Sequence, residues 1–368
     1  MPPVPAEAGK NIRSAADCKL VVTMIDKYNR EINYLRVSVT DRCNLRCVYC
    51  TPREGQSLLG HDDILRYEEI SRIIRMAVKI GVAKVRITGG EPLVRHGIVD
   101  FIASLKTIEG IDDISLTTNG TFLEAFAERL FDAGMKRINI SLDSLHAGKY
   151  ARITRGGDLD AVLRGIDKVC RIGFSPIKIN TVAIKGFNDD EILDFTRLAL
   201  YKPYQIRFIE LMPIGQAGME NNGKYLSNDI VKERISRFYR LEPVNGNQES
   251  EVRDQGSEVR DQGAGGRGPA QIFRIASGVG EIGFISPVSR QFCRSCNRLR
   301  LTADGHLRAC LLSEAEVDLK GPLRNGCSDE ELERLLKRVI AGKQKQYSMA
   351  CNENHVKKCM REMSSIGG

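Results

Sequence analysis

Short runs of β-branched and aliphatic residues alternate with longer amphipathic stretches over the first two thirds of the chain. Six runs have the length and composition of strands, and they lie at 35–39, 84–88, 114–118, 137–142, 177–184 and 205–211. Between them, 67–81 and 121–134 repeat apolar positions at helical spacing and end in glycine. This alternation predicts an α/β fold with parallel strands joined by right-handed crossovers. A barrel, whole or partial, and an open doubly wound sheet both fit it.

Unusual short sequences follow five of the six predicted strands. They read TDRCNLRCVYC, GGEP, TNG, LDS and MPIG. In barrels and in doubly wound sheets the loops at the carboxyl ends of the strands carry the chemistry. The sequence therefore predicts one active-site face.

The last third of the chain has a different pattern. The stretch 245–268 is polar and glycine-rich and contains SEVRDQG twice in tandem, which indicates a flexible insertion. After it, 271–276 and 280–286 predict a hairpin, and 328–343 predicts a charged helix. We expect a flexible leader at 1–26, a core at 27–244 and a smaller C-terminal domain at 269–368.

Composition limits the class of protein. The chain has 368 residues, 42% of them hydrophobic and 28% charged, as in soluble globular proteins. Its net charge of +8 suits an anionic ligand such as a nucleotide, or nucleic acid, without choosing between them. No apolar run approaches the ~18–20 residues of a membrane span, and no signal-peptide pattern opens the chain. We expect a cytoplasmic protein that does not bind membranes.

Six of the eleven cysteines form two close groups, a pattern that favours metal or cluster binding in a reducing compartment. In the first group Cys43, Cys47 and Cys50 are spaced Cys-x3-Cys-x2-Cys. A structural zinc site needs four ligands, and no fourth cysteine or histidine lies close by. Three thiolates suit a [4Fe–4S] cluster with one open iron, where a cofactor can bind.

The sequence CNLRCVYC after one strand, with GGEP after the next, resembles the radical S-adenosylmethionine (SAM) enzymes. The resemblance implies a partial (β/α)6 TIM-like barrel in which the open iron of the first cluster holds SAM. One electron then cleaves SAM to a 5′-deoxyadenosyl radical, while the protein positions the substrate.

Within that superfamily, eight motifs in order resemble the GTP 3′,8-cyclases of molybdenum cofactor biosynthesis. They include VRITGGEP, INISLDSL, RFIELMPIG, FCRSCNRLRLTADGHLRAC and the final Gly-Gly. This resemblance implies a second [4Fe–4S] cluster in the C-terminal domain, held by Cys293, Cys296 and Cys310, whose open iron binds guanine. A zinc site completed by His306 or Cys327 is the less favoured alternative, because no further Cys-x2-Cys partner is present.

The same resemblance assigns the ligand contacts. It implies GTP contacts at Arg36, Arg86, Thr117, Lys178, Arg298, Leu299 and Arg300. It implies SAM contacts at Tyr49, Gly90, Ser141 and Met212. It also implies that Gly367 and Gly368 reach into the active site and are needed for cyclisation. Independently, strand alternation predicts that Arg86 and Lys178 share one face of the sheet, and glycine at position 90 suits a close backbone approach to the cofactor.

The implied reaction converts GTP to (8S)-3′,8-cyclo-7,8-dihydroguanosine 5′-triphosphate. The implied partners are an electron donor and the downstream pterin-forming enzyme, cyclic pyranopterin monophosphate synthase, and the resemblance allows a homodimer. Two alternatives stay open: a radical SAM enzyme that modifies peptides and carries an auxiliary cluster, and a zinc-stabilised nucleic-acid-binding protein. The GGEP motif and the first triad disfavour the nucleic-acid interpretation.

Overall fold

The computed structural model describes residues 23–244, 269–346, 359 and 361–367. The expected leader at 1–26 lies mostly outside the described residues, and the expected insertion at 245–268 lies wholly outside them. Gly368 also lies outside, so its predicted role remains an expectation.

Six parallel strands form the centre of the sheet and follow one another in sequence order. They are β1 (Tyr34–Ser38), β2 (Lys84–Thr88), β3 (Asp113–Thr118), β4 (Ile138–Ser141), β5 (Ile177–Ala183) and β6 (Tyr204–Glu210). All six predicted strands are confirmed. A doubly wound sheet reverses its strand order partway across, so the unbroken order favours the partial barrel over the open sheet.

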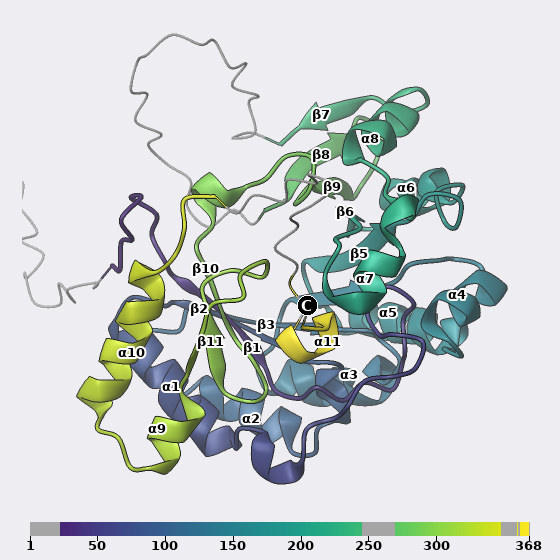
Figure 1. Cartoon of the computed structure of the whole chain (residues 1–368). Coiled ribbons are helices and arrows are strands. Elements are labelled where there is room, and N and C mark those ends of the chain that lie inside the picture. The colour runs from purple at the N-terminus through teal and green to yellow at the C-terminus, as the bar shows by residue number, and fades with distance from the viewer. Residues whose placement is uncertain (1–22, 245–268, 347–358, 360, 368) are drawn as a thin grey trace, which may run out of the picture.

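Helices follow the central strands and cover the outer face of the sheet (Figure 1). They are α1 (Tyr67–Lys79), α2 (Ile98–Leu105), α3 (Leu123–Asp132), α4 (Ala147–Thr154), α5 (Leu159–Ile172) and α6 (Ile192–Tyr201). The two helices predicted from periodicity correspond to α1 and α3. Gly81 and Gly134, which follow them, adopt left-handed backbone angles, as expected after a helix end.

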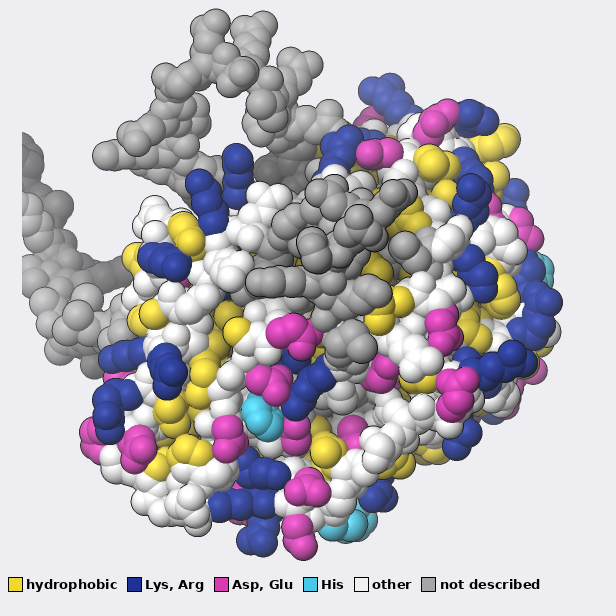
Figure 2. Space-filling view, in the orientation of Figure 1, with side chains coloured by type: hydrophobic (Ala, Val, Ile, Leu, Met, Phe, Trp, Pro, Cys, Tyr) yellow, Lys and Arg dark blue, Asp and Glu magenta, His cyan; other side chains and the backbone are white. Residues whose placement is uncertain are grey.

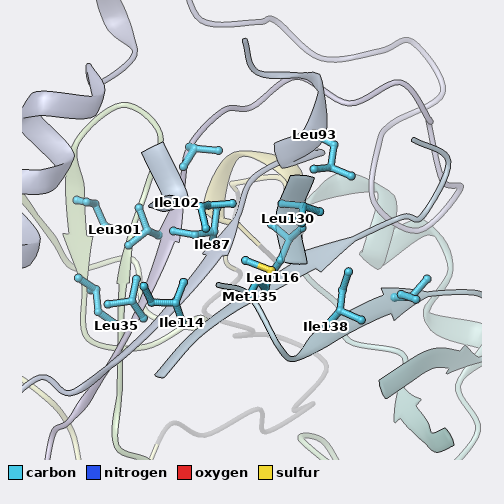
Figure 3. Close-up of a cluster of buried hydrophobic side chains, with 14 of the residues drawn as sticks. Leu35, Ile87, Leu93, Ile102, Ile114, Leu116, Leu130, Met135, Ile138 and Leu301 are labelled. Carbon is cyan, nitrogen blue, oxygen red and sulfur yellow. The ribbon is translucent and has the colours of Figure 1, made fainter. Parts of the chain in front are cut away.

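Apolar side chains alternate along each strand and pack against these helices. Figure 3 shows Leu35, Ile87 and Leu116 from three neighbouring strands close to Ile102 of α2 and Leu130 of α3. All five are fully buried. Because successive residues of a strand point to opposite faces, the residues between the apolar ones point to the inner face, away from the helices.

The C-terminal part extends this sheet at both edges. At one edge β9 (Glu281–Ile285) pairs parallel with β6 and antiparallel with β8 (Gln271–Ile275), which confirms the predicted hairpin; β7 (Leu241–Pro243) follows. At the other edge β10 (Arg298–Leu301) pairs parallel with β1, followed by β11 (His306–Arg308) and β12 (Glu316–Asp318). The C-terminal strands therefore flank the predicted core on two sides.

The remaining helices are short except one. They are α7 (Gly215–Glu220), α8 (Asn228–Ser236), α9 (Lys320–Arg324), α10 (Asp329–Ala341) and α11 (Met363–Ile366). The predicted charged helix is confirmed as α10, which begins after Ser328, whose hydroxyl accepts a hydrogen bond from the Glu331 amide. It lies beside α1, where Arg72 Nε donates to Asp329 Oδ1 over 3.0 Å (Figure 1). Among the described residues, no helix is both long and apolar enough to cross a membrane.

Candidate active site

Both cysteine triads line one cavity of about 320 Å³, the first at the carboxyl end of β1 and the second at the amino end of β10, which runs parallel to β1. Cys43, Cys47 and Cys50 lie in the loop after β1, and residues from each of the other four marked loops line the same cavity. The second triad comes from a short 3-10 turn before β10 and from the residue two places after β11. One active-site face, predicted from the five motifs, is therefore what the structure has.

The first triad lies among acidic and neutral groups. Burial, followed by the charge of Asp143, raises the pKa of Cys47 well above its ordinary value. Burial, followed by the neighbouring Cys43, raises the pKa of Cys50 to about 12. Hydrogen-bond donors still reach one sulfur, since the Leu45 amide lies 3.4 Å and Asn119 Nδ2 lies 3.7 Å from Cys43 Sγ.

The GGEP turn packs directly against the loop of the first triad. A Cβ at Gly90 would lie 2.4 Å from the carbonyl oxygen of Arg42, so only glycine fits there. From the sequence, glycine suits position 90 because the backbone there would come close to the cofactor. The structure gives a second reason: the backbone of Gly90 packs against the backbone of Arg42, just before Cys43. Buried Glu91 accepts hydrogen bonds from the amides of Leu93 and Asn119 over 3.0 and 2.6 Å, which ties this turn to the next loop.

The four residues expected to contact SAM line the cavity. Tyr49, Gly90, Ser141 and Met212 come from the loop after β1, the loop after β2, the end of β4 and the loop after β6. Tyr49 donates its hydroxyl to Asp143 Oδ2 over 2.6 Å. Burial raises the pKa of Asp143 to about 6, while that hydrogen bond opposes the rise. Asp143, within the LDS motif, is a cavity residue that the sequence analysis did not single out.

Arginines occupy matching positions on adjacent strands of the inner face. Arg300 of β10 pairs in register with Arg36 of β1, which pairs with Arg86 of β2. Arg207 of β6 and Arg298 of β10 line the same cavity. Arg207 was missed from the sequence, although QIRFIEL shows the same charged residue between apolar neighbours that marked Arg86.

This concentration of positive charge is largely uncompensated. Arg86, Arg207, Arg298 and Arg300 form no ion pair with a carboxylate within the described part of the chain; Arg86 donates instead to the Ser115 hydroxyl and Arg207 to Gln205 Oε1. Burial, with nearby arginines, lowers the pKa of Arg207 to about 9 and that of Arg300 to about 10. Buried like charges without partners are costly, so the arrangement favours an anionic ligand.

The aromatic ring of Tyr34 keeps two of these guanidinium groups in place. Arg86 lies 5.4 Å and Arg298 lies 5.9 Å from its centroid. Buried Thr117 Oγ1 and Asn180 Oδ1, which face the cavity, have no hydrogen-bond partner among the described residues. Such orphaned atoms in a cavity are suited to a polar ligand.

Lys178 and Leu299 lie outside this cavity. Lys178 lines a second cavity of about 570 Å³, which shares Arg86, Arg207 and Arg298 with the first. Lys178 and Arg86 thus share one face, as alternation predicted. Burial, with Arg207 and Arg86, lowers the pKa of Lys178 to about 7. The Leu299 side chain is fully buried in the core, so only its backbone is left to contact a ligand, as expected.

Met363 and Ser364 line the cavity, and the segment 361–367 to which they belong includes the short helix α11 in Figure 1. The Gly367 carbonyl accepts a hydrogen bond from Arg300 Nη1 over 3.1 Å. Glycine is required at this position, because φ is +78° and a Cβ would lie 2.6 Å from Thr88 Oγ1. Upstream, Arg361 donates to both carboxylate oxygens of Asp304, and this contact ties the segment to the turn between β10 and β11.

The donor sets suit iron–sulfur clusters better than single metal ions. All six cysteines are free thiols that face the cavity. Over the described residues, no three His, Cys, Asp or Glu side chains converge closely enough to hold one metal ion. In a cluster each thiolate binds a different iron, so convergence on one atom is not required. The zinc alternative gains no fourth ligand here, because His306 Nδ1 lies 3.2 Å from Asp304 and neither His306 nor Cys327 lines the cavity.

A parallel sheet in sequence order, with three thiols after its first strand and a glycine turn after its second, defines a radical SAM protein. Models of the Radical SAM superfamily and of Molybdenum Cofactor Synthesis C match residues 37–199 and 204–349. Two curated GTP 3′,8-cyclases, from Moorella thermoacetica and Thermodesulfovibrio yellowstonii, are 48% and 47% identical in sequence to this chain. Each alignment covers 94% of this chain and 100% of the relative. The chain belongs to the GTP 3′,8-cyclase family.

Solved structures support the fold alone. The crystal structure of Streptococcus suis SuiB bound to S-adenosylmethionine superposes with a TM-score of 0.52 at 15% identity. The superposition covers 79% of this chain and 64% of SuiB. The partial-barrel prediction thus agrees with the strand order, and the similar fold of a solved structure supports it.

Proposed function

We propose that this protein is a radical SAM GTP 3′,8-cyclase that forms (8S)-3′,8-cyclo-7,8-dihydroguanosine 5′-triphosphate for molybdenum cofactor synthesis. The observation that carries the proposal is that two cysteine triads share one cavity with Arg86, Arg207, Arg298 and Arg300, which form no ion pair with a carboxylate among the described residues. The relatives named GTP 3′,8-cyclase supply the reaction, and the cavity supplies a site suited to it.

In this proposal Cys43, Cys47 and Cys50 hold a cluster that binds SAM, and Cys293, Cys296 and Cys310 hold a second cluster that binds guanine. When bound, the first cluster and SAM supply the radical that removes the ribose 3′ hydrogen. The protein's own residues orient the substrate. Tyr49, Gly90, Ser141 and Met212 would surround SAM, and the Asp143 hydrogen bond would fix the Tyr49 ring.

The arginines would hold the triphosphate. Guanidinium groups bind phosphate oxygens in bidentate pairs, and a triphosphate brings negative charge to this group of arginines. Arg36, Arg86, Arg298 and Arg300 line this cavity with Thr117, and Lys178 would meet the phosphates from the second cavity. Binding energy at the phosphates would then hold C3′ close to C8 of guanine. Gly367 would complete the site beside Arg300.

An electron donor and the pterin-forming cyclic pyranopterin monophosphate synthase complete the proposed pathway. The peptide-modifying alternative finds less support, because a peptide does not require the arginine cluster. The nucleic-acid alternative finds little support on the visible surface, where Lys and Arg mix with Asp and Glu and form no dense basic stripe (Figure 2).

Anaerobic reconstitution followed by iron analysis tests the proposal. Two clusters require about eight irons per chain. With SAM and a reductant, 5′-deoxyadenosine should form much faster when GTP is added. Bound zinc in place of iron, or 5′-deoxyadenosine formation that ignores GTP, would refute it.

A further inference from the structure

A buried lysine next to the second triad has no role in the function described so far. Lys343 follows α10, and only 2% of its surface is exposed. Its ammonium group has three hydrogens to donate, and three acceptors lie within reach. Nζ lies 2.9 Å from the Arg298 carbonyl, 2.6 Å from the Ala309 carbonyl and 3.7 Å from Cys296 Sγ.

These acceptors place Lys343 between the two segments that carry the triad. The Arg298 carbonyl is two residues beyond Cys296, and the Ala309 carbonyl immediately precedes Cys310. A single ammonium group therefore ties the two ligand-bearing segments together while pointing one hydrogen at a ligand sulfur.

The charge of Lys343 has no carboxylate partner among the described residues. Burial lowers the pKa of Lys343, and negative charge at Cys296 and Cys310 is what most opposes that effect. A buried ammonium without a counter-charge is strongly destabilising, so its position makes physical sense when the triad is negative. Arg30 provides a contrast: it donates to the Cys293 carbonyl over 2.7 Å, yet Asp26 lies 2.6 Å away and balances its charge.

In the part of the chain that the structure describes, no lysine or arginine donates a hydrogen bond to a sulfur of the first triad. The charged side chains that act most strongly on its three thiols are Glu91, Asp143 and Glu362, all of them acidic. Positive charge near a thiolate-bound cluster favours its more negative, reduced form, and negative charge does the opposite.

We propose that Lys343 is a positioning residue that supplies the counter-charge of the second cluster, raising its reduction potential and joining its two ligand segments. The proposal rests on the proposed function, because it needs a cluster at Cys293, Cys296 and Cys310. It assigns the two clusters different tasks: the second would accept an electron more readily than the first.

Redox titration of the second cluster alone tests this role. The parent is the full chain with Cys43, Cys47 and Cys50 all changed to Ser, reconstituted anaerobically and followed by electron paramagnetic resonance. Lys343→Met and Lys343→Gln both remove the charge, and the Gln variant keeps a hydrogen-bond donor. We expect each variant to lower the equilibrium constant for cluster reduction by about tenfold. For a one-electron couple this makes the reduction potential about 59 mV more negative.

Two controls accompany these variants. Lys337→Met removes one positive charge from an exposed position of α10, where Lys337 pairs with Glu333 over 2.6 Å, and should leave the potential unchanged. Lys343→Arg keeps the charge and should give the parent potential. If the neutral variants lose their iron, recovery of iron and potential in Lys343→Arg supports the proposal.

The outcomes separate the two claims. A parent that holds no iron would overturn the second cluster itself and, with it, the proposed function. A parent with iron whose potential is unmoved by Lys343→Met and Lys343→Gln would overturn the counter-charge alone. Loss of iron in Lys343→Arg as well, with the parent's circular dichroism retained, would also overturn it.

Discussion

The two cysteine triads offer the same three ligands to one cavity from opposite electrostatic surroundings. Around the first, burial and acidic neighbours raise the pKa of Cys47 and Cys50. Around the second, burial raises the pKa of Cys310, but at Cys296 the charges of Lys343 and Arg298 outweigh burial and lower the pKa. Both sites therefore offer three thiols, but the charges that the fold brings to each of them differ.

This difference suits two different tasks. A site with acidic neighbours keeps a bound cluster strongly reducing, as cleavage of SAM requires. A site with cationic neighbours suits an anionic substrate, because the same guanidinium groups that stabilise thiolates also attract phosphates. We expect four perturbations to separate the two regions, from the largest effect to the smallest.

Loss of a ligand from either triad should have the largest effect, and a different one at each site. Cys47→Ser should abolish 5′-deoxyadenosine formation, because SAM has no iron to bind. Cys296→Ser should abolish cyclised product while slow cleavage of SAM continues. Each variant should lose about four irons. Iron analysis and chromatography of both products check this, and SAM cleavage by Cys47→Ser at the parent rate would reverse the assignment.

Removing a guanidinium group from the second region should weaken GTP binding strongly. Truncation of one partner of a buried charge pair costs about 2–5 kcal/mol, so Arg298→Ala or Arg300→Ala should raise the Kd for GTP at least about thirtyfold. Arg294→Ala is the matched control, since Arg294 is exposed in the same segment and does not line the cavity. Calorimetry under anaerobic conditions measures the affinity; equal Kd values for all three variants would contradict the arginine assignment.

The Arg361 anchor should have an intermediate effect that appears in the segment 361–367. Arg361 Nη2 lies 2.8 Å from Asp304 Oδ2 and 3.1 Å from Glu316 Oε1. Asp304→Asn should speed hydrogen exchange across this segment and lower product formation more than SAM cleavage. A charge-swapped pair, Asp304→Arg with Arg361→Asp, should recover part of the loss if the contact itself matters. Unchanged exchange in Asp304→Asn would show that other contacts hold the segment.

The smallest effect should be a pH dependence at His306. Asp304, whose Oδ2 lies 3.2 Å from Nδ1 of His306, raises the pKa of His306 in the folded state; burial opposes this rise, and the charge of Glu316 adds to it. The stabilisation is therefore complete below the unfolded pKa of about 6.5 and is lost as pH rises through the raised folded pKa. His306→Gln should flatten the urea midpoint over that interval. If the urea midpoint of the wild type depends on pH as that of the variant does, His306 makes no such contribution.

Local patterns were enough to predict the six central strands, three of the helices (α1, α3 and α10) and the hairpin, because each depends on periodicity within one segment. The five motifs marked the active-site face for the same reason. The pairing of β9 with β6 and of β10 with β1 could not be predicted, since it joins residues far apart in the sequence. The division into a core and a smaller domain therefore remains a proposal, and the shared sheet shows how closely the two parts are connected.

The residues of the candidate site also fall into those that sequence patterns predict and those that only the tertiary structure reveals. Cysteines and glycines carry a recognisable spacing, whereas Lys343 and Arg361 lie outside every motif and gain meaning only from tertiary contacts. Arg207 is an intermediate case. It was not selected from the sequence, but its place between apolar residues in QIRFIEL could have predicted that it lies on the same face as Arg86. Gly90 shows that a residue can be selected correctly while part of its physical reason, the close packing against Arg42, is visible only in the structure.

The most direct test of the single two-triad site uses GTP that carries deuterium at C3′. Cyclisation within one cavity predicts that this deuterium is transferred to 5′-deoxyadenosine. The cyclised product should then have the mass of unlabelled GTP, and one 5′-deoxyadenosine should form for each product molecule. Mass spectrometry of both products measures the transfer. Unlabelled 5′-deoxyadenosine, or labelled 5′-deoxyadenosine without a cyclised nucleotide, would contradict the account.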